Sequence, residues 1–365
     1  MSTKQLIKRH KTRQVKVGDI YIGGQAPVSV QSMTKTDTRD VKATVAQIKE
    51  LEKEGCEIIR SAVVDMEAAQ KLGQIKRKIN IPLVADIHFD WRLALEAINQ
   101  GVDKIRINPG NIEKREYIER IIQTAKKARI AVRIGVNAGS LKALHITSKT
   151  VSQRAQLMVS AALKHIALFE KMNFYDLVVS LKSSDVLTTI EAYKLMTAKS
   201  NYPLHLGITE AGTNFAGTIK SAVGLGSLLT DGIGDTIRVS LTDSPVEEVR
   251  VGYEILKALG LRRQGPEIIS CPTCGRCEID IIKIARQVEK QISPRLAGEY
   301  KKPLKVAIMG CVVNGPGEAR EADIGVAGGR KFGLLFRDGK IIKRVPEKDL
   351  VKVLVEEIKN LKKGY

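Results

Sequence analysis

Apolar, largely β-branched runs recur along the first part of the chain, and each is followed by a stretch with apolar residues at helical spacing. Amphipathic stretches such as VKATVAQIKELEKEG and VEEVRVGYEILKALG separate the runs. The runs are continuously apolar, as expected for strands that are covered on both faces. They predict eight strands, at Val28–Met33, Glu57–Ala62, Leu83–His88, Lys104–Asn108, Ala131–Val136, Leu177–Leu181, Leu204–Thr209 and Thr236–Leu241.

Eight strand–helix units in about 240 residues match the size of a TIM (β/α)8 barrel. The alternative is a doubly wound open sheet, which is weakened because no G-x-G-x-x-G follows the first strand. No P-loop is present either. Two short β-like pieces, Val15–Val17 and Ile20–Ile22, predict a hairpin within residues 1–27, before the barrel.

The pattern changes after LRRQGP (Leu261–Pro266), which we interpret as a short linker. Short strands at Glu267–Ser270 and Lys305–Met309, a helix near Glu278–Gln291 and a turn at Asp338-Gly339 predict a small α/β domain. The predicted organisation is therefore a barrel over residues 1–260, a linker over 261–266 and a second domain over 267–365.

The formal net charge of +20 admits three interpretations: a solvated basic surface, a nucleic-acid face, or attraction of a small polyanion. Aromatic residues make up only 4%, and no RNA-binding signature or helix-turn-helix pattern is found, which weakens the second interpretation without removing it. The chain contains no apolar run long enough to span a bilayer, and its basic N-terminus lacks the apolar stretch of a secretory signal. We therefore expect a cytoplasmic protein.

Charged and polar residues gather where the predicted strands end, which is where the chemistry of a TIM barrel is located. These residues are Arg60, Asp86, His88, Arg106, Asn108, Arg133, Asn137, Lys182, Glu210, Arg238 and Ser240. Cations converging from several strands repel one another and lose hydration, and a bound phosphate or diphosphate would relieve both costs. Ordinary ion pairs with Asp or Glu are the alternative for any single residue. Glu210 either neutralises an arginine or transfers a proton.

The chain has five cysteines, and an odd number argues against a disulfide framework. Cys56 precedes a strand and is expected in the core. The run CPTCGRC (Cys271, Cys274, Cys277) and the later Cys311 predict a metal site, and their spacing suits zinc and iron–sulfur ligation equally. The Gly- and Pro-containing loop GCVVNGPGE can return Glu318 toward Cys311, which favours an iron with a labile carboxylate ligand.

SCPTCGR and GCVVNGPGE resemble the signature of the 4-hydroxy-3-methylbut-2-enyl diphosphate synthase family. VQSMT, ADIHF, IRINPGN, RIGVN, SLKSS, GITEAG and IRVSLT are similar to the same family's barrel motifs, so the resemblance covers nearly the whole chain. It implies a barrel like that of dihydropteroate synthase, followed by a reductase-like iron–sulfur domain. The implied reaction is the reductive ring opening and dehydration of 2-C-methyl-D-erythritol 2,4-cyclodiphosphate to 4-hydroxy-3-methylbut-2-enyl diphosphate.

The resemblance also implies roles for individual residues. One [4Fe–4S] cluster per chain would be held by Cys271, Cys274, Cys311 and Glu318. The implied diphosphate ligands are Arg60, His88, Arg106, Arg133, Lys182 and Ser240, with Asn137 beside them. Glu210 is the implied proton-transfer residue, and Asn314 is a weaker candidate for a substrate contact. Cys277 stands where the family uses no cysteine ligand, so it could compete with Glu318.

The partners implied by the resemblance are flavodoxin or ferredoxin as electron donor and a second copy of the chain. In that homodimer the cluster domain of one subunit faces the barrel of the other. Two other functions stay open on the residues alone. One is a zinc-stabilised nucleic-acid-binding protein, and the other is a metal-independent phosphate-binding barrel enzyme such as an isomerase or aldolase. The latter leaves the C-terminal cysteines unexplained.

Overall fold

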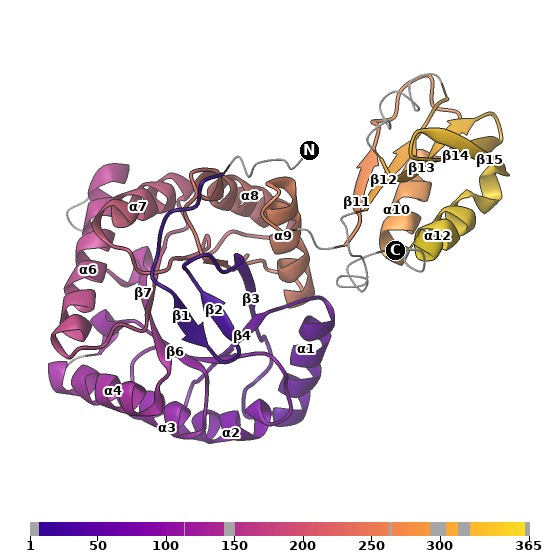
Figure 1. Cartoon of the computed structure of the whole chain (residues 1–365). Coiled ribbons are helices and arrows are strands. Elements are labelled where there is room, and N and C mark those ends of the chain that lie inside the picture. The colour runs from indigo at the N-terminus through magenta and orange to yellow at the C-terminus, as the bar shows by residue number, and fades with distance from the viewer. Residues whose placement is uncertain are drawn as a thin grey trace. The chain divides into compact units, whose positions relative to one another are not determined.

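The chain folds into two compact units, Met1–Arg262 and Arg263–Tyr365 (Figure 1). The computed structural model describes residues 7–112, 114–141, 150–262, 265–292, 304–312 and 322–361. None of the helices in these ranges combines the length and the apolar character needed to cross a lipid bilayer.

The first unit is a barrel of parallel strands, as the sequence predicts. Its strands are β3 (Ser29–Met33), β4 (Ile58–Ala62), β5 (Leu83–Ile87), β6 (Lys104–Ile107), β7 (Ala131–Asn137), β8 (Leu177–Lys182), β9 (His205–Leu206) and β10 (Thr236–Ile237). They pair in the order β8-β7-β6-β5-β4-β3-β10-β9. A parallel bridge between Val179 and Leu204 joins β8 to the residue before β9, and this contact closes the ring. The predicted TIM barrel is therefore confirmed.

A ring of helices surrounds the strands (Figure 1). It consists of α1 (Val41–Lys53), α2 (Met66–Lys76), α3 (Trp91–Asn99), α4 (Arg115–Ala128), α6 (Val151–Lys171), α7 (Val186–Lys199), α8 (Asn214–Thr230) and α9 (Pro245–Ala258). Several helices begin at a residue that accepts a hydrogen bond from the first turn, such as Asp65 for α2 and Asp185 for α7. Apolar residues on the outer faces of the strands pack against these helices and form the main core.

An N-terminal hairpin covers one end of the barrel. Its antiparallel strands β1 (Val15–Val17) and β2 (Ile20–Ile22) match the predicted pieces, and they cross the middle of the ring in Figure 1. Hairpin residues such as Val17 pack against residues at the amino ends of the barrel strands, among them Ile58 and Ala131. An apolar cluster thus seals the amino-terminal end, and the opposite end carries the polar side chains.

The last two barrel strands are shorter than predicted. The sequence indicates Leu204–Thr209 and Thr236–Leu241, whereas only two residues of each are paired as strand. Farther along, backbone hydrogen bonds alternate with bonds to side chains. Glu248, for example, accepts the hydrogen bond of the Leu241 N–H at 3.1 Å. The predicted lengths of these two strands are therefore wrong, although their positions are right.

The described residues of the second unit form a five-stranded mixed sheet with two helices. The strands β11 (Glu267–Ser270), β12 (Lys305–Met309) and β13 (Ile324–Gly329) are parallel, and β14 (Phe332–Arg337) and β15 (Lys340–Pro346) continue the sheet antiparallel. The helices α10 (Ile281–Ile292) and α12 (Leu350–Leu361) share an apolar core with the sheet. The turn predicted at Asp338-Gly339 is present, and both residues have positive φ.

Candidate active site

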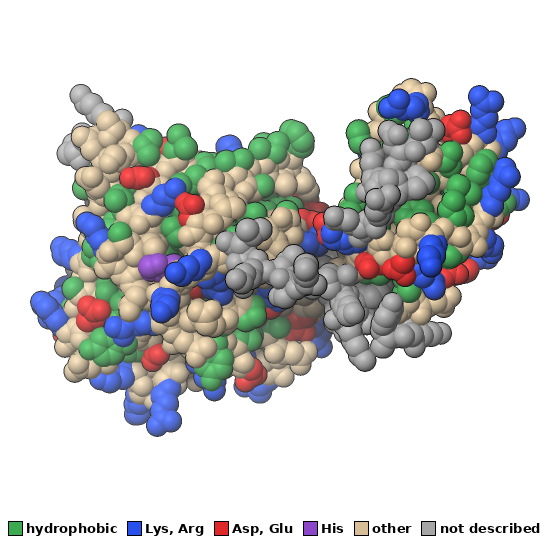
Figure 2. All heavy atoms as spheres, turned by 45° about the horizontal axis from the view of Figure 1, so that its top comes forward, with side chains coloured by type: hydrophobic (Ala, Val, Ile, Leu, Met, Phe, Trp, Pro, Cys, Tyr) green, Lys and Arg blue, Asp and Glu red, His purple; other side chains and the backbone are tan. Residues whose placement is uncertain are grey.

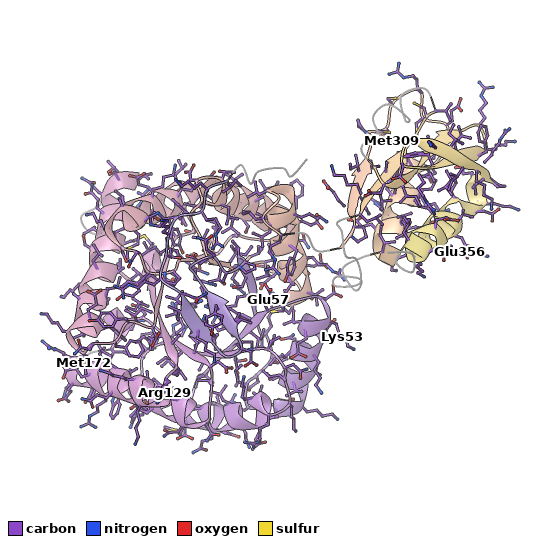
Figure 3. All side chains as sticks on the ribbon, viewed as in Figure 1. Lys53, Glu57, Arg129, Met172, Met309 and Glu356 are labelled. Atoms are coloured by element: carbon purple, nitrogen blue, oxygen red, sulfur yellow. The ribbon has the colours of Figure 1, made fainter. Side chains whose placement is uncertain are left out.

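Cationic side chains line the interior of the barrel above the apolar seal. Ile58 and Ala131 face the hairpin, so Arg60 and Arg133, two positions later on the same strands, face the same interior. Lys104 is in register with Ala131 and therefore shares that interior face. The interior cations are Arg60 (β4), Lys104 and Arg106 (β6), Arg133 (β7), Lys182 (β8) and Arg238, just beyond β10. Side chains fill the space enclosed by the strands (Figure 3).

Asp86 is the central acid of this group. Its carboxylate lies 3.1 Å from Arg106 Nη1, 3.8 Å from Arg60 Nε and 3.3 Å from His88 Nε2. Burial opposes ionisation of the carboxyl, but Arg60, the His88 hydrogen bond, Arg106 and Arg133 outweigh it and hold the pKa of Asp86 well below its usual range. Asp86 is therefore a fixed negative charge that orients two of the arginines.

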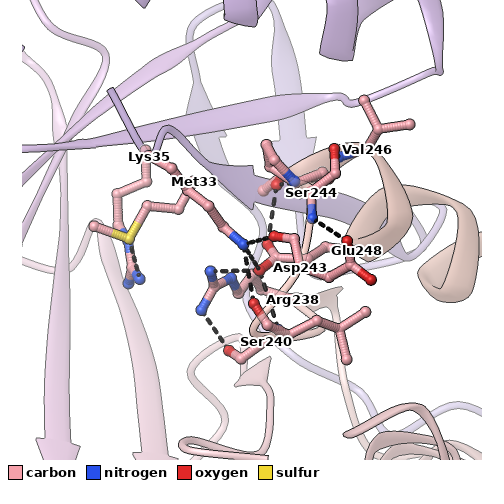
Figure 4. A network of polar contacts seen from close by, with 12 residues as sticks. Met33, Lys35, Arg238, Ser240, Asp243, Ser244, Val246 and Glu248 are labelled. Atoms are coloured by element: carbon pink, nitrogen blue, oxygen red, sulfur yellow. Dashed lines mark hydrogen bonds and ion pairs between the residues drawn. The ribbon is translucent and has the colours of Figure 1, made fainter. Parts of the chain in front are cut away.

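Glu248 of α9 is the second acid, and it reaches the barrel from outside (Figure 4). Its carboxylate accepts hydrogen bonds from Arg238 at 3.0 Å and from the Ser32 hydroxyl at 3.2 Å. Lys35 lies 3.6 Å away and also donates to the carbonyl of Leu241. Glu248 is fully buried, so its position fixes the direction of the Arg238 guanidinium.

The described interior has six cations and, in contact with them, two carboxylates, Asp86 and Glu248. Several buried cationic nitrogens have no hydrogen-bond partner among the described residues: Lys104 Nζ, Arg106 Nε, Arg133 Nε and Nη1, and Arg238 Nε. Burial, followed by repulsion from Arg133 and Arg60, lowers the pKa of Lys104 and of Lys182 well below the ordinary value. The interior therefore lacks negative charge, which a bound polyanion would supply.

Two interior glycines make room for these cations. A Cβ at Gly135 would lie 2.6 Å from Arg106 Nε, and a Cβ at Gly207 would lie 2.6 Å from Lys182 Nζ. Neither glycine has a positive φ, so space rather than backbone conformation explains them. Arg106 thus lies against the backbone of β7, and Lys182 crosses the backbone just after β9.

The remaining predicted site residues lie at the carboxyl ends of the strands. The His88 side chain is half exposed, and its Nε2 lies 3.2 Å from Arg106 Nη1. Asn137 ends β7 in register with Lys182 of β8. The Ser240 hydroxyl accepts a hydrogen bond from Arg238. Glu210 follows β9, is exposed, and has a φ of 52°, a left-handed conformation that is uncommon for a residue other than glycine.

The cysteines Cys271, Cys274, Cys277 and Cys311 all lie in the second unit. Ser270 of β11 pairs with Ile308 of β12, so Cys271 and Cys311 follow the carboxyl ends of neighbouring parallel strands. The Gly310 N–H donates to Cys271 Sγ at 3.2 Å, which holds this sulfur beside the carboxyl end of β12. Cys274 is exposed. Cys56 is buried in the barrel core, as predicted.

The donor chemistry suits an iron–sulfur centre. No three His, Cys, Asp or Glu residues in the described ranges are grouped closely enough to hold a single metal ion. The thiols of Cys271 and Cys311 are half-buried beside two neighbouring strand ends and that of Cys274 is exposed, so these thiols can reach a bound cluster, and thiolate is the usual ligand of iron–sulfur centres. Cys277 differs, because its Sγ donates to the Ile279 carbonyl at 3.2 Å. Glu318 and Asn314 lie outside the described residues.

Two interior residues were not predicted from the sequence. Lys104 and His205 are both fully buried, and His205 Nε2 lies 3.3 Å from Lys182 Nζ. Both stand at the first position of a strand, whereas the prediction followed only the strand ends. The two-residue alternation through Arg106 was a signal that could have revealed Lys104.

Lys and Arg side chains on the face drawn in Figure 2 are interspersed with acidic ones rather than gathered into one stripe. This distribution gives no support to a nucleic-acid surface, and neither do the relatives described below. It agrees with a solvated basic surface for the charges outside the barrel interior.

Comparison with known proteins identifies the family of the chain and the solved structures that share its barrel fold. The GcpE TIM-barrel domain model matches residues 12–253, and the GcpE protein C-terminal domain model matches residues 267–360. A protein of Caldanaerobacter subterraneus subsp. tengcongensis is 59% identical over 98% of this chain and 99% of its own length. One of Clostridium perfringens is 57% identical over 97% and 100%. Both are named 4-hydroxy-3-methylbut-2-en-1-yl diphosphate synthase (flavodoxin).

Among solved structures, dihydropteroate synthase from Stenotrophomonas maltophilia aligns with a TM-score of 0.52 at 14% identity, covering 68% of this chain and 97% of that one. This likeness concerns the barrel fold alone. The family models match both units of the chain, and the relatives match it over nearly its full length. The chain therefore belongs to the GcpE family of 4-hydroxy-3-methylbut-2-en-1-yl diphosphate synthases, as the resemblance of its motifs indicates.

Proposed function

We propose that this protein reductively opens the ring of 2-C-methyl-D-erythritol 2,4-cyclodiphosphate and dehydrates it to 4-hydroxy-3-methylbut-2-enyl diphosphate. The observation that carries the proposal is the barrel interior, where, among the residues that the structure describes, six cations face two carboxylates and several nitrogens have no partner. A diphosphate brings the missing charge and acceptor oxygens. Counted on the fully protonated acids, the reaction consumes two electrons and two protons and releases one water.

In this proposal the diphosphate contacts come from the barrel interior and its rim. Arg106 is already oriented by Asp86, so it presents a fixed pair of donors to a phosphate oxygen. The proposed contact residues are Arg60, His88, Arg106, Arg133, Lys182 and Ser240, with Asn137 beside them. Preformed donors lower the entropy that binding costs, and they stabilise the charge that develops on the phosphate as the ring opens.

Glu210 is the proposed proton-transfer residue. Glu210 is exposed at the carboxyl end of the barrel. It lies three residues after Gly207, the glycine against which the Lys182 ammonium packs. The left-handed backbone at Glu210 is a local strain of the kind that accumulates at functional sites. The carboxyl would protonate the oxygen that leaves as water.

We assign substrate binding to residues 1–260 and the cluster to residues 267–365. The thiolates of Cys271, Cys274 and Cys311, together with Glu318, would hold one [4Fe–4S] cluster per chain. When bound, such a cluster supplies electrons one at a time. The names of the relatives make flavodoxin the first donor to test, with ferredoxin as the second. Cys277 is not assigned as a ligand, because its thiol is turned to the Ile279 carbonyl.

The active assembly in this proposal is a cytoplasmic homodimer in which the cluster domain of one subunit serves the barrel of the other. A mixture of Glu210→Gln and Cys311→Ala proteins then regains activity after subunit exchange, because one mixed site contains both intact halves. Full exchange, verified by mass, without any recovered activity contradicts this arrangement.

Anaerobic purification followed by iron and sulfide analysis tests the cluster, and turnover of the cyclic diphosphate with reduced flavodoxin tests the reaction. About four iron and four sulfide per chain are expected. A colourless protein with one zinc, or a brown protein that does not consume the cyclic diphosphate, overturns the proposal.

A further inference from the structure

Lys182, a proposed diphosphate contact, has a buried histidine as its partner. Its Nζ lies 3.3 Å from His205 Nε2, and His205 is fully buried. An ammonium group has three N–H donors, so one bond to His205 leaves two for an anion. Burial, followed by Arg133 and Lys182, lowers the pKa of His205 well below its ordinary value. The imidazole is therefore neutral, and in the tautomer with its proton on Nδ1 it accepts the hydrogen bond at Nε2.

This acceptor matters because the surroundings of Lys182 disfavour its charge. Burial and the nearby Arg133, Arg60 and Arg238 lower the pKa of the lysine. Among the described residues, the hydrogen-bond partner of the ammonium is His205. Without that acceptor, the buried lysine would lose part of its stabilisation as a cation and could swing away from the position that Gly207 leaves open.

Tyr193 of α7 fixes the two strands that carry this pair. Its buried hydroxyl accepts from the Leu181 N–H at 3.1 Å and donates to the His205 carbonyl at 2.5 Å. Leu181 is the residue before Lys182, so the hydroxyl holds the backbone of both partners.

The Tyr193 hydroxyl lies between the neighbouring strands β8 and β9. Two residues earlier along β8, the Val179 N–H donates a hydrogen bond to the Pro203 carbonyl at 2.9 Å. In a regular parallel ladder the next bond would join the Leu181 N–H to the His205 carbonyl. The Tyr193 hydroxyl is inserted between these two groups and bonds both, so the strands are joined through a side chain at the level of Lys182 and His205.

We infer that His205 and Tyr193 are positioning residues for Lys182: His205 holds the ammonium over Gly207 toward the anion, and Tyr193 sets the separation of the strands that brings the two side chains together. The inference rests on the proposed diphosphate binding at Lys182. Neither residue needs to touch the substrate. Replacing either one should therefore weaken anion binding only by displacing the Lys182 ammonium.

The test is a set of coupled substitutions in the anaerobically purified full chain. His205→Met removes the acceptor, His205→Gln keeps one, and Tyr193→Phe removes only the hydroxyl. Each is made in the wild-type and in the Lys182→Met background. Calorimetry gives the dissociation constant for inorganic pyrophosphate, and steady-state kinetics give KM and kcat for the cyclic diphosphate.

His205→Met should weaken pyrophosphate binding by roughly tenfold or more, Tyr193→Phe by about two- to tenfold, and His205→Gln less than His205→Met. KM should rise more than kcat falls. In the Lys182→Met background the same changes should have almost no further effect.

Equal losses in both backgrounds would mean a general structural role and would overturn the inference, as would wild-type affinity in His205→Met and Tyr193→Phe. The pyrophosphate measurement needs no turnover. It therefore judges the role of His205 even if the cyclic diphosphate proves not to be the substrate, an outcome that would refute the proposed function alone.

Discussion

Arg133 offers a test in which stability and affinity should move in opposite directions. It is buried in the barrel interior, and its Nε and Nη1 have no hydrogen-bond partner among the described residues. Burial, followed by repulsion from Arg60 and Arg106, lowers its pKa well below the ordinary value. The nearby acid, Asp86, is already engaged by those two arginines. The charge on Arg133 should therefore destabilise the protein when no anion is bound.

Replacing Arg133 with methionine removes the charge and keeps a long side chain. Replacement of buried charges by apolar residues stabilises by about 1–4 kcal/mol, and imperfect filling offsets roughly 1 kcal/mol of that gain. The net gain is then between zero and roughly 3 kcal/mol, which should raise the thermal midpoint of the barrel by up to about 9 °C. The lost phosphate contact should weaken pyrophosphate binding on the order of tenfold or more.

Arg9→Met is the matched control. Arg9 is also largely buried, but its guanidinium pairs with Asp235 at 2.9 Å. Removing it leaves the buried Asp235 carboxylate without its cationic partner, although the Thr12 hydroxyl and the Leu204 N–H still donate to it. The stability should therefore fall by roughly 3–5 kcal/mol, and the midpoint with it, while pyrophosphate affinity is unchanged. Both variants are compared with wild type by scanning calorimetry at equal iron content, with and without pyrophosphate. The reasoning is refuted if Arg133→Met lowers the midpoint as Arg9→Met does.

Three further predictions concern space, pH and the cluster. Gly207→Ala should raise KM by about tenfold or more, because the added Cβ would lie 2.6 Å from Lys182 Nζ and 2.7 Å from the Arg238 carbonyl oxygen and would displace both. Gly226→Ala, with open space around it, should leave KM unchanged, and equal KM values contradict the crossing geometry. The pKa of Asp86 is lowered in the folded protein, so its ionised carboxylate stabilises the fold above about pH 4, and this stabilisation is lost as the pH falls further. In Asp86→Asn, the free energy of unfolding should therefore fall less steeply below about pH 4 than in the wild type. Cys277→Ser should keep the iron–sulfur absorbance that Cys271→Ser loses, and the reverse result would make Cys277 a ligand.

The architecture and the interior cations could be predicted because both depend on regular patterns along the chain. Apolar runs separated by amphipathic helices indicate the barrel, and the two-residue alternation along a strand places Arg106 on the interior face. Lys104 lies on the same face one step earlier, but it is the first residue of its strand, at the end of a TIM barrel where catalytic residues are not expected. The hairpin that seals the barrel was predicted from two short apolar pieces.

Contacts between a strand and its covering helix could not be predicted in the same way. Nothing in the sequence around Tyr193 distinguishes a tyrosine that fills the core from one whose hydroxyl enters a strand ladder. The same contacts explain why β9 was predicted too long, since a side chain replaces one of its backbone partners. The roles proposed for Glu318 and Asn314 lie outside the described residues and depend on the motif alone.

The most informative feature of the sequence is a violation of a general rule. Buried charges are normally paired, and the described part of the barrel places six cations against two carboxylates, so it should fold less well than a barrel with an apolar interior. The apolar hairpin cluster below the cations shows that the same barrel can be filled with apolar side chains. A buried group of like charges that the described part of the chain does not neutralise needs a counter-charge from outside the chain. The unpaired cations therefore point to an anionic ligand.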